Sequence, residues 1–468
     1  MTFVQPAFVV LFGIVFTLYW LAPRKSWQNL VLCVSSAIFY GWVHPWFLGL
    51  LAFSAVLDFV SGLQMEAHPT RRKPWLAISL IGNLGLLGVF KYYDFFVSNL
   101  AVALARLGTP VSLPTLGLLL PVGISFYTFQ TLSYTIDVYR GRLAARRNFL
   151  DYLTFILMFP HLVAGPVMKA KDLLPQLEVD RRFDGARVRE GLTLALWGAA
   201  KKIMIADSVS LYVDRVFAMD NPPLILVALS SMGFGVQILA DFSGYTDIAR
   251  GTARMLGIEL MLNFNHPFLA ANPGDFWRRW HISFSRWIHE YVYEPLRGGA
   301  TDERRRTLAT FGSLGISGLW HGANWSYVVW GMYHAVLITG YRYVTPQIPA
   351  SWKDRRWSHP LAVGIMFGFL QVHWLLFRET QLSRTWHYLT TWPELSDPTL
   401  WAVAALLAGV YLWAAVPMVL VLLAERHVYP RIPDRWLLPA QAGAWALCLV
   451  AIGVFARDTR ADFIYFSF

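Results

Sequence analysis

Residues 307–341 read TLATFGSLGISGLWHGANWSYVVWGMYHAVLITGY, a run of 35 residues without Asp, Glu, Lys or Arg. A helix that crosses the ~30 Å hydrocarbon core of a bilayer needs about 20 mostly apolar residues. The run is therefore long enough for a membrane span, and it carries His321 near its middle.

Similar stretches with few or no charged residues recur along the chain. Residues 26–57 are long enough for two helices, with a break expected at His44-Pro45. Counting all stretches predicts an all-α polytopic membrane protein with about 11 transmembrane helices, plus re-entrant and interfacial helices. The candidate spans are residues 1–23, 26–57, 74–90, 107–136, 221–240, 307–341, 360–377, 398–424 and 436–456, and the more broken candidates are 92–106, 150–166 and 191–213.

The composition agrees with membrane residence. Hydrophobic residues make up 56% of the 468 residues and charged residues only 15%, whereas soluble domains carry roughly 25% charged residues. This excludes a soluble globular enzyme, a disordered chain and a fibre. The net charge of +11 is better explained by basic loops at an anionic cytoplasmic leaflet than by nucleic-acid binding. We find no repeat or long linker and expect one membrane domain over 1–468.

The distribution of basic residues predicts the orientation. Arg24-Lys25 follows the first span, the His44-Pro45 turn has no Lys or Arg, and residues 71–73 read RRK. The positive-inside rule then places the N-terminus outside the cytoplasm. Residues 167–190 are the most charged segment, and we expect cytoplasmic loops or interfacial helices there.

His321 is the main candidate for chemistry. A titratable group deep in an uncharged run is costly unless it lines a cavity or finds partners. Burial disfavours the imidazolium form, so His321 is expected to be neutral at pH 7 and able to accept a proton, as a general base must. If the segment is helical, Asn324 shares its face and could hydrogen-bond near it. A buried structural histidine is the alternative interpretation.

A second candidate segment, residues 276–287, reads FWRRWHISFSRW. Its aromatic residues recur every three or four positions, which predicts an amphipathic helix at the membrane interface. Its arginines could instead bind a phosphate-bearing donor, because guanidinium groups match phosphate geometry.

Other motifs are absent or less specific. Asp241 follows an apolar stretch and could mark a proton pathway or a helix end. There is no G-x-S-x-G elbow, no P-loop and no H-E-x-x-H zinc helix, and the two cysteines have no metal spacing. We expect no metal and no bound cofactor.

Taken in order, several motifs resemble the membrane-bound O-acyltransferases, and most closely their bacterial branch, the alginate O-acetyltransferase membrane subunit. The resemblance spans nearly the whole chain. The matching stretches are FYGW at 39–42, GISFYTFQ at 123–130, DVYRG at 137–141, DFSGY at 241–245, FWRRWHIS at 276–283, WHGANW at 320–325 and FIYFSF at 463–468.

The resemblance implies a ring of transmembrane helices around a central tunnel, with a catalytic core at approximately 110–345. It implies that His321 is the family's essential histidine and that His281 matches a second family histidine. It further implies an acyl thioester on the cytoplasmic side, a periplasmic partner and a polysaccharide acceptor. The residues that we expect to bind substrate or donor are Asn324, Trp320, Arg278, Arg279, Trp280, Ser283 and Asp241.

We therefore expect an O-acetyltransferase subunit that takes acetyl from a cytoplasmic thioester, with acetyl-CoA as co-substrate, and passes it across the membrane to an exopolysaccharide such as alginate. His321 would act as general base or carry the acetyl group itself. Two alternatives stay open. One is a polytopic transporter or channel with a histidine and acid proton relay and no covalent chemistry, and the other is a scaffold subunit.

Overall fold

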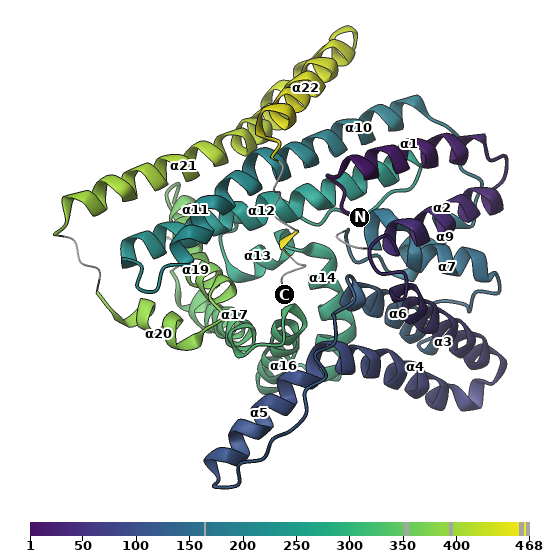
Figure 1. Ribbon diagram of the computed structural model, residues 1–468, viewed down its shortest axis with the longest axis horizontal. Coiled ribbons are helices and arrows are strands. Elements are labelled where there is room, and N and C mark those ends of the chain that lie inside the picture. The colour runs from purple at the N-terminus through teal and green to yellow at the C-terminus, as the bar shows by residue number, and fades with distance from the viewer. Residues whose placement is uncertain (163–164, 350, 352–354, 393–395, 458–462, 465–468) are drawn as a thin grey trace. The chain divides into compact units, whose positions relative to one another are not determined.

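The computed structural model describes residues 1–162, 165–349, 351, 355–392, 396–457 and 463–464, which form helices joined by turns and loops without any strand (Figure 1). The all-helical fold predicted from the sequence is confirmed. The chain divides into two compact units. The N-terminal unit comprises residues 1–192 and 249–261, and the C-terminal unit comprises residues 193–248 and 262–468.

The N-terminal unit is a bundle in which α3 packs against α4 and α6, and α2 packs against α1 and α7. Its helices are α1 (Pro6–Leu21), α2 (Lys25–Tyr40), α3 (Phe47–Ala67), α4 (Arg72–Leu87), α5 (Tyr93–Arg106), α6 (Ile124–Tyr139), α7 (Phe149–Leu157), α8 (Phe159–Leu162) and α9 (Ala170–Leu177), with a short 3₁₀ turn Pro69–Arg71 and a π-helical turn Gly88–Tyr92.

Two sequence expectations about this unit had different outcomes. The predicted break at His44-Pro45 is confirmed, because α2 ends at Tyr40 and α3 begins at Phe47. The predicted span 107–136 is wrong, because residues 107–123 contain no helix and α6 begins only at Ile124. Prolines at 110, 114 and 121 remove backbone donors and clash with the preceding turn, so an uncharged composition cannot make this stretch helical.

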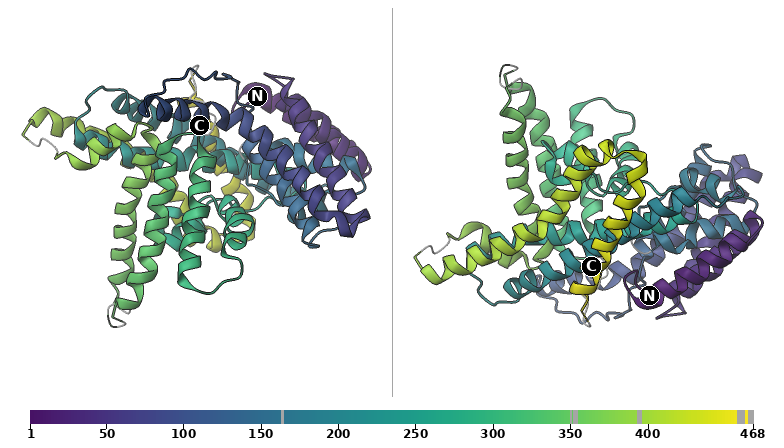
Figure 2. Two further views of the ribbon diagram at one scale, coloured as in Figure 1. Left: turned by 90° about the horizontal axis from the view of Figure 1, so that it is seen from below. Right: turned by 90° about the horizontal axis from the view of Figure 1, so that it is seen from above.

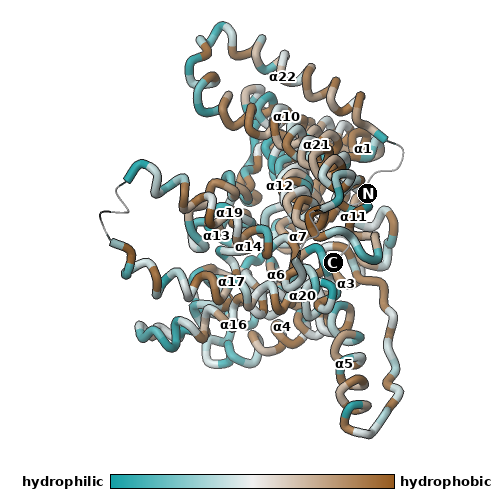
Figure 3. The backbone as a smooth tube through the Cα atoms, turned by 90° about the vertical axis from the view of Figure 1, so that its left-hand side faces the viewer, coloured by the Kyte–Doolittle hydropathy of each residue, from teal (hydrophilic) through white to brown (hydrophobic). Residues whose placement is uncertain are grey.

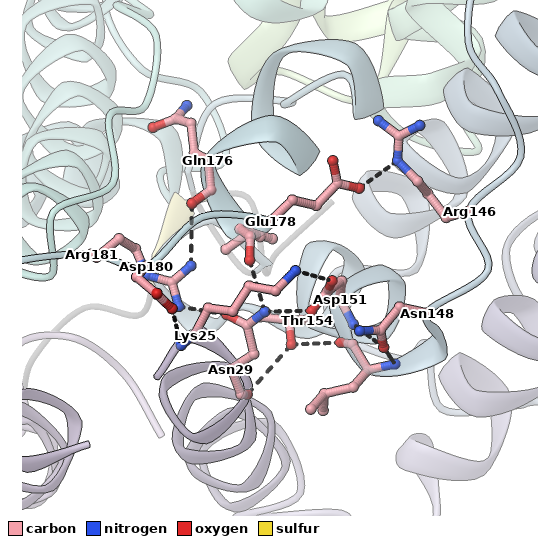
Figure 4. A network of polar contacts seen from close by, with 12 residues as sticks. Lys25, Asn29, Arg146, Asn148, Asp151, Thr154, Gln176, Glu178, Asp180 and Arg181 are labelled. Atoms are coloured by element: carbon pink, nitrogen blue, oxygen red, sulfur yellow. Dashed lines mark hydrogen bonds and ion pairs between the residues drawn. The ribbon is translucent and has the colours of Figure 1, made fainter. Parts of the chain in front are cut away.

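Part of the charged segment 167–190 is buried in a polar network of the N-terminal unit (Figure 4). Arg181, which is 8% exposed, donates to Asn29 Oδ1 at 2.6 Å. Asn29 Nδ2 in turn donates to Asp151 Oδ1 at 2.7 Å, and Lys25 pairs with the same carboxylate at 3.2 Å. Charged side chains are buried when they are paired in this way. Arg181 therefore links the segment after α9 to α2 and, through Asn29, to α7.

The C-terminal unit contains three helices, α16, α17 and α19, that run side by side (Figure 2). Its helices are α11 (Asp207–Phe217), α12 (Leu224–Met255), α13 (Pro273–Arg279), α14 (Ile282–Ile288), α15 (Glu294–Arg297), α16 (Glu303–His321), α17 (Trp325–Val344), α19 (Ser358–Arg378), α20 (Leu382–Thr390), α21 (Pro398–Leu423) and α22 (Asp434–Phe455). The unit boundary passes through α10 (Gly185–Ala200) and through α12.

Within the described residues, six helical stretches are long and apolar enough to cross a membrane. They are residues 47–67, 69–106, 224–255, 358–378, 398–431 and 434–455. Apolar residues predominate along α21 and α22, as the brown colour of Figure 3 shows. α1 is also apolar but has only 16 residues. A multi-pass membrane protein is thus confirmed, while the total of about 11 spans stays a prediction.

Candidate functional site

The uncharged run 307–341 forms two helices rather than one. α16 ends at His321 and α17 begins at Trp325, and the side chain of Asn324 caps α17 by accepting a hydrogen bond from Ser326 N at 2.9 Å. Asn324 is extended, with φ −149°, so the expectation that it shares a helical face with His321 is wrong. The structure gives Asn324 the role of an N-cap.

His321, at the last position of α16, is 3% exposed and surrounded by aromatic rings. Ring centroids lie 4.9 Å away for Trp330, 5.0 Å for Trp320, 5.2 Å for Phe377 and 5.3 Å for Phe284. The site is therefore well packed and excludes bulk water, which strengthens any electrostatic interaction within it.

His281 lies at a break in the segment that the sequence predicted to be one amphipathic helix. That prediction is wrong, because α13 ends at Arg279 and α14 begins at Ile282, with His281 between them at φ 42°. The left-handed conformation is uncommon outside glycine. Asn263 holds the break: its carbonyl accepts Ile282 N at 2.9 Å, and its Oδ1 accepts the hydroxyl of Ser283 at 2.8 Å.

The break brings the two predicted catalytic histidines to the same pair of aromatic rings. The Phe284 ring lies 4.9 Å from His281 and 5.3 Å from His321, and the Trp320 ring lies 6.1 Å and 5.0 Å from them. His281 is fully buried, and burial lowers its pKa to about 3, so its imidazole is neutral at physiological pH. The structure thus contains two buried imidazoles around one aromatic pair.

A cavity of about 480 Å³ lies next to this pair. It has the size of a small-molecule site. Phe284, which packs against both histidines, forms part of its wall, and Ser317 lines it one helical turn before His321. The lining residues are Trp277, Arg278, Phe284, Ser285, Ile288, His289, Tyr293, Arg306, Thr310, Ser313, Leu314, Ser317, Ile338 and Arg342.

Two arginines of the cavity, Arg306 and Arg342, were not selected from the sequence. They are the residues immediately before and after the uncharged run 307–341. The hairpin of α16 and α17 brings them together, and both pair with Glu303, at 3.2 Å and 2.8 Å. Their flanking positions alone do not single them out, because every uncharged run ends at charged residues.

The other predicted binding residues have varied surroundings. Arg278 lines the cavity, is 69% exposed and pairs with Asp275 at 3.6 Å. Arg279 is not among the lining residues and pairs with Asp275 at 3.0 Å. Trp280 is 3% exposed and packs against Phe276, with ring centroids 5.8 Å apart. Of these three residues, the geometry therefore favours only Arg278 for contact with a bound molecule.

Asp241 lies inside α12 and forms a buried ion pair with Lys202 at 2.9 Å. A second carboxylate, Asp207, pairs with Lys202 at 2.7 Å. Burial alone would lower the pKa of Lys202, but the two carboxylates outweigh burial and raise the pKa above its ordinary value. Lys202 is therefore a cation, and Asp241 has a structural partner. Among the described residues, no cluster of three or more His, Cys, Asp or Glu side chains could hold a metal ion.

Known proteins that are similar to this chain are named as acyltransferases. The model of the membrane-bound O-acyltransferase family matches residues 140–374, which contain both histidines. The chain is 38% identical to the probable alginate O-acetylase AlgI of Azotobacter vinelandii over 86% of this chain and 79% of that protein. It is 32% identical to the peptidoglycan O-acetyltransferase of Helicobacter pylori over 77% of this chain and 73% of that protein.

A more distant similarity connects the chain with another acyl-transfer system. It is 28% identical to the teichoic acid D-alanyltransferase of Bacillus subtilis over 55% of this chain and 68% of that protein. The family match, the similarity to O-acetyltransferases over most of the chain and the apolar helices agree with one another. The chain therefore belongs to the membrane-bound O-acyltransferase family and is a membrane-embedded O-acyltransferase.

Proposed function

We propose that this protein takes an acetyl group from a cytoplasmic thioester, with acetyl-CoA as the donor, and passes it across the inner membrane for O-acetylation of an exopolysaccharide such as alginate. The proposal rests on the observation that Phe284 forms part of the cavity wall. This ring joins a cavity that contains three arginines to the two buried histidines.

The basic residues of the cavity suit a phosphate-bearing donor. Arg278, Arg306 and Arg342 line it, and none of its lining residues is acidic. Guanidinium groups bind phosphate oxygens in a planar, two-pronged geometry. The hydroxyls of Thr310, Ser313 and Ser317, which are also lining residues, continue along α16 toward His321. We assign the arginines to the donor phosphates and the hydroxyl-bearing face to the chain that ends in the thioester.

His321 would act as the general base in acetyl transfer. The hydroxyl oxygen of the acceptor attacks the thioester carbonyl carbon while His321 removes the hydroxyl proton. The carbon–sulfur bond then breaks, and the proton passes from the imidazolium of His321 to the departing thiolate. His281, on the same aromatic pair, is assigned to orient the acceptor or stabilise the oxyanion. Transient acetylation of His321 itself would use the same imidazole as nucleophile.

The acceptor side is proposed from the relatives. One of them is named a probable alginate O-acetylase and another a peptidoglycan O-acetyltransferase. A polysaccharide acceptor and a periplasmic acetyltransferase partner that receives the acetyl group are the arrangement that we propose for this chain. Another acyl donor is the competing possibility, because one relative is named for D-alanyl transfer rather than acetyl transfer.

The experiment uses the purified protein in nanodiscs with radiolabelled acetyl-CoA and follows free thiol and labelled protein. We expect thiol release or protein label in the wild type and a loss of about 10²–10⁴-fold in a His321→Ala variant that still folds. The control is His359→Ala, because His359 is exposed. Normal turnover by His321→Ala would contradict the assignment of His321. If no candidate polymer or partner elicits turnover, the acetyl-CoA proposal is wrong.

A further inference from the structure

A pair of buried histidines lies next to Trp330, one of the aromatic residues that surround His321. His334 of α17 and His373 of α19 are 0% and 1% exposed, and His334 Nε2 lies 2.6 Å from His373 Nδ1. The indole Nε1 of Trp330, which is 1% exposed, donates to the same His373 Nδ1 at 3.0 Å. One ring nitrogen thus receives two contacts inside a fully buried part of the C-terminal unit.

The donor and acceptor roles in this cluster follow from the indole. A tryptophan N–H can only donate, so His373 Nδ1 must be an unprotonated acceptor. A proton on Nδ1 would point at the indole hydrogen. His334 must then donate from Nε2, and because full burial disfavours the imidazolium form, its Nδ1 is the unprotonated nitrogen. His373 and His334 are therefore held as defined neutral tautomers, and neither can share the other's proton without breaking the bond to Trp330.

Trp330 connects the pair to the catalytic histidine. Its indole meets the imidazole of His321 edge to face, with centroids 4.9 Å apart and planes at 82°. Phe377 lies against both rings, 5.5 Å from Trp330 and 5.2 Å from His321. A buried indole N–H without an acceptor is costly. The orientation of the Trp330 ring therefore depends on the acceptor that His373 provides.

We infer that His373 and His334 are positioning residues for acyl transfer: they fix the indole of Trp330 and thereby the orientation of the His321 imidazole. The inference rests on the proposed role of His321. It gives these two histidines no contact with the substrate, and it predicts that they affect the rate of transfer more than the binding of the donor.

The test replaces the acceptor atom and then restores it. His373→Leu removes the acceptor, whereas His373→Asn keeps one, because Asn Oδ1 takes the place of Nδ1. We expect His373→Leu to lower kcat about tenfold or more while KM for acetyl-CoA changes about twofold or less, and His373→Asn to stay within about threefold of wild type. Trp330→Phe should cause the same loss as His373→Leu, and the double variant should be no worse than either.

Met366→Ala is the matched control. Met366 is 2% exposed on the same helix, two turns from His373, and it tests whether any loss of buried volume there affects kcat. Full activity of His373→Leu beside an inactive His321→Ala would overturn the inference but leave the proposed function intact. An equal loss in His373→Asn and His373→Leu would also overturn it, because the imidazole rather than an acceptor would then be required.

A second measurement does not depend on turnover. Nitrogen NMR of protein labelled with ¹⁵N-histidine should show an unprotonated, hydrogen-bonded Nδ1 for His373, identified by its loss in His373→Asn. This signal should shift in Trp330→Phe. A protonated Nδ1 on His373 would overturn the inference. Loss of thiol release in all proteins, wild type included, would count against the acetyl-CoA proposal instead.

Discussion

The carboxylate of Asp241 accepts a hydrogen bond from the backbone N–H of Ile464 at 2.7 Å, although the two residues are 223 positions apart in the chain. The preceding residue, Phe463, packs on Tyr245 and Phe242 with ring centroids 4.4 Å and 5.6 Å away. Phe242 in turn contacts the His281 ring at 4.7 Å. The end of the described chain is therefore bound to the aromatic surroundings of the site.

Asp241→Ala should destabilise the protein. The change leaves Lys202 buried with one carboxylate instead of two and removes the acceptor for Ile464 N. Removal of one partner of a buried pair costs about 3 kcal/mol or more. Thermal unfolding in detergent measures the effect. Glu259→Ala is the control, because the Arg254–Glu259 pair is partly exposed and should contribute less than about 1 kcal/mol. Equal melting temperatures for both variants would contradict this account.

Gly331→Ala should disrupt the hairpin of α16 and α17. A Cβ at Gly331 would overlap the backbone carbonyl oxygen of Leu314, which cannot move without displacing α16. Overpacking of this kind typically costs about 1–3 kcal/mol. Gly340 on the same helix has open space around its Cβ position, so Gly340→Ala should be neutral or stabilising by up to about 1 kcal/mol. Unfolding midpoints of the two variants give the comparison, and similar values would refute the close approach.

Loss of Arg306 and Arg342, which flank the uncharged run 307–341, should weaken donor binding. The variant Arg306→Gln/Arg342→Gln removes two of the three guanidinium groups of the cavity. If they bind donor phosphates, KM for acetyl-CoA should rise about tenfold, which corresponds to about 1.4 kcal/mol, with a smaller change in kcat. Arg304→Gln is the control, because Arg304 is exposed and does not line the cavity. An unchanged KM in the double variant would show that these arginines do not bind the donor.

Stability should fall in mild acid. Burial lowers the pKa of His281 and of His161 to about 3, below the value of about 6.5 in an unfolded chain. Between these values the unfolded state binds more protons, so the stabilisation is complete above about pH 6.5 and is lost as the pH falls. The free energy of unfolding should therefore fall by about 1.4 kcal/mol per pH unit for each histidine.

Denaturation measured between pH 7.5 and pH 5 tests this dependence. His161→Gln should reduce the number of protons taken up on unfolding by about one, and the pH dependence of the unfolding free energy should fall accordingly. Glutamine keeps polar atoms at the site but does not titrate in this range. His68→Gln, at an exposed position, should leave the slope unchanged. A slope in His161→Gln equal to that of the wild type would show that His161 does not contribute.

The main candidates and the fold class were accessible from the sequence, because uncharged runs and their length report directly on a bilayer environment. The placement of Arg306 and Arg342 in one cavity was not, although both flank the same run. Their proximity requires the turn at Gly322–Asn324, and the continuous apolar pattern hides that turn. The helical face proposed for His321 and Asn324 was wrong for the same reason.

The sequence by itself determined that this chain is an all-helical membrane protein with His321 inside an uncharged segment and His281 in an aromatic one. Only the tertiary structure decided that both imidazoles contact Phe284 and Trp320, and that His373 provides the acceptor for Trp330. Composition and periodicity describe which side chains avoid water. They do not specify which residues of distant helices meet, because that depends on how α14, α16, α17 and α19 pack together.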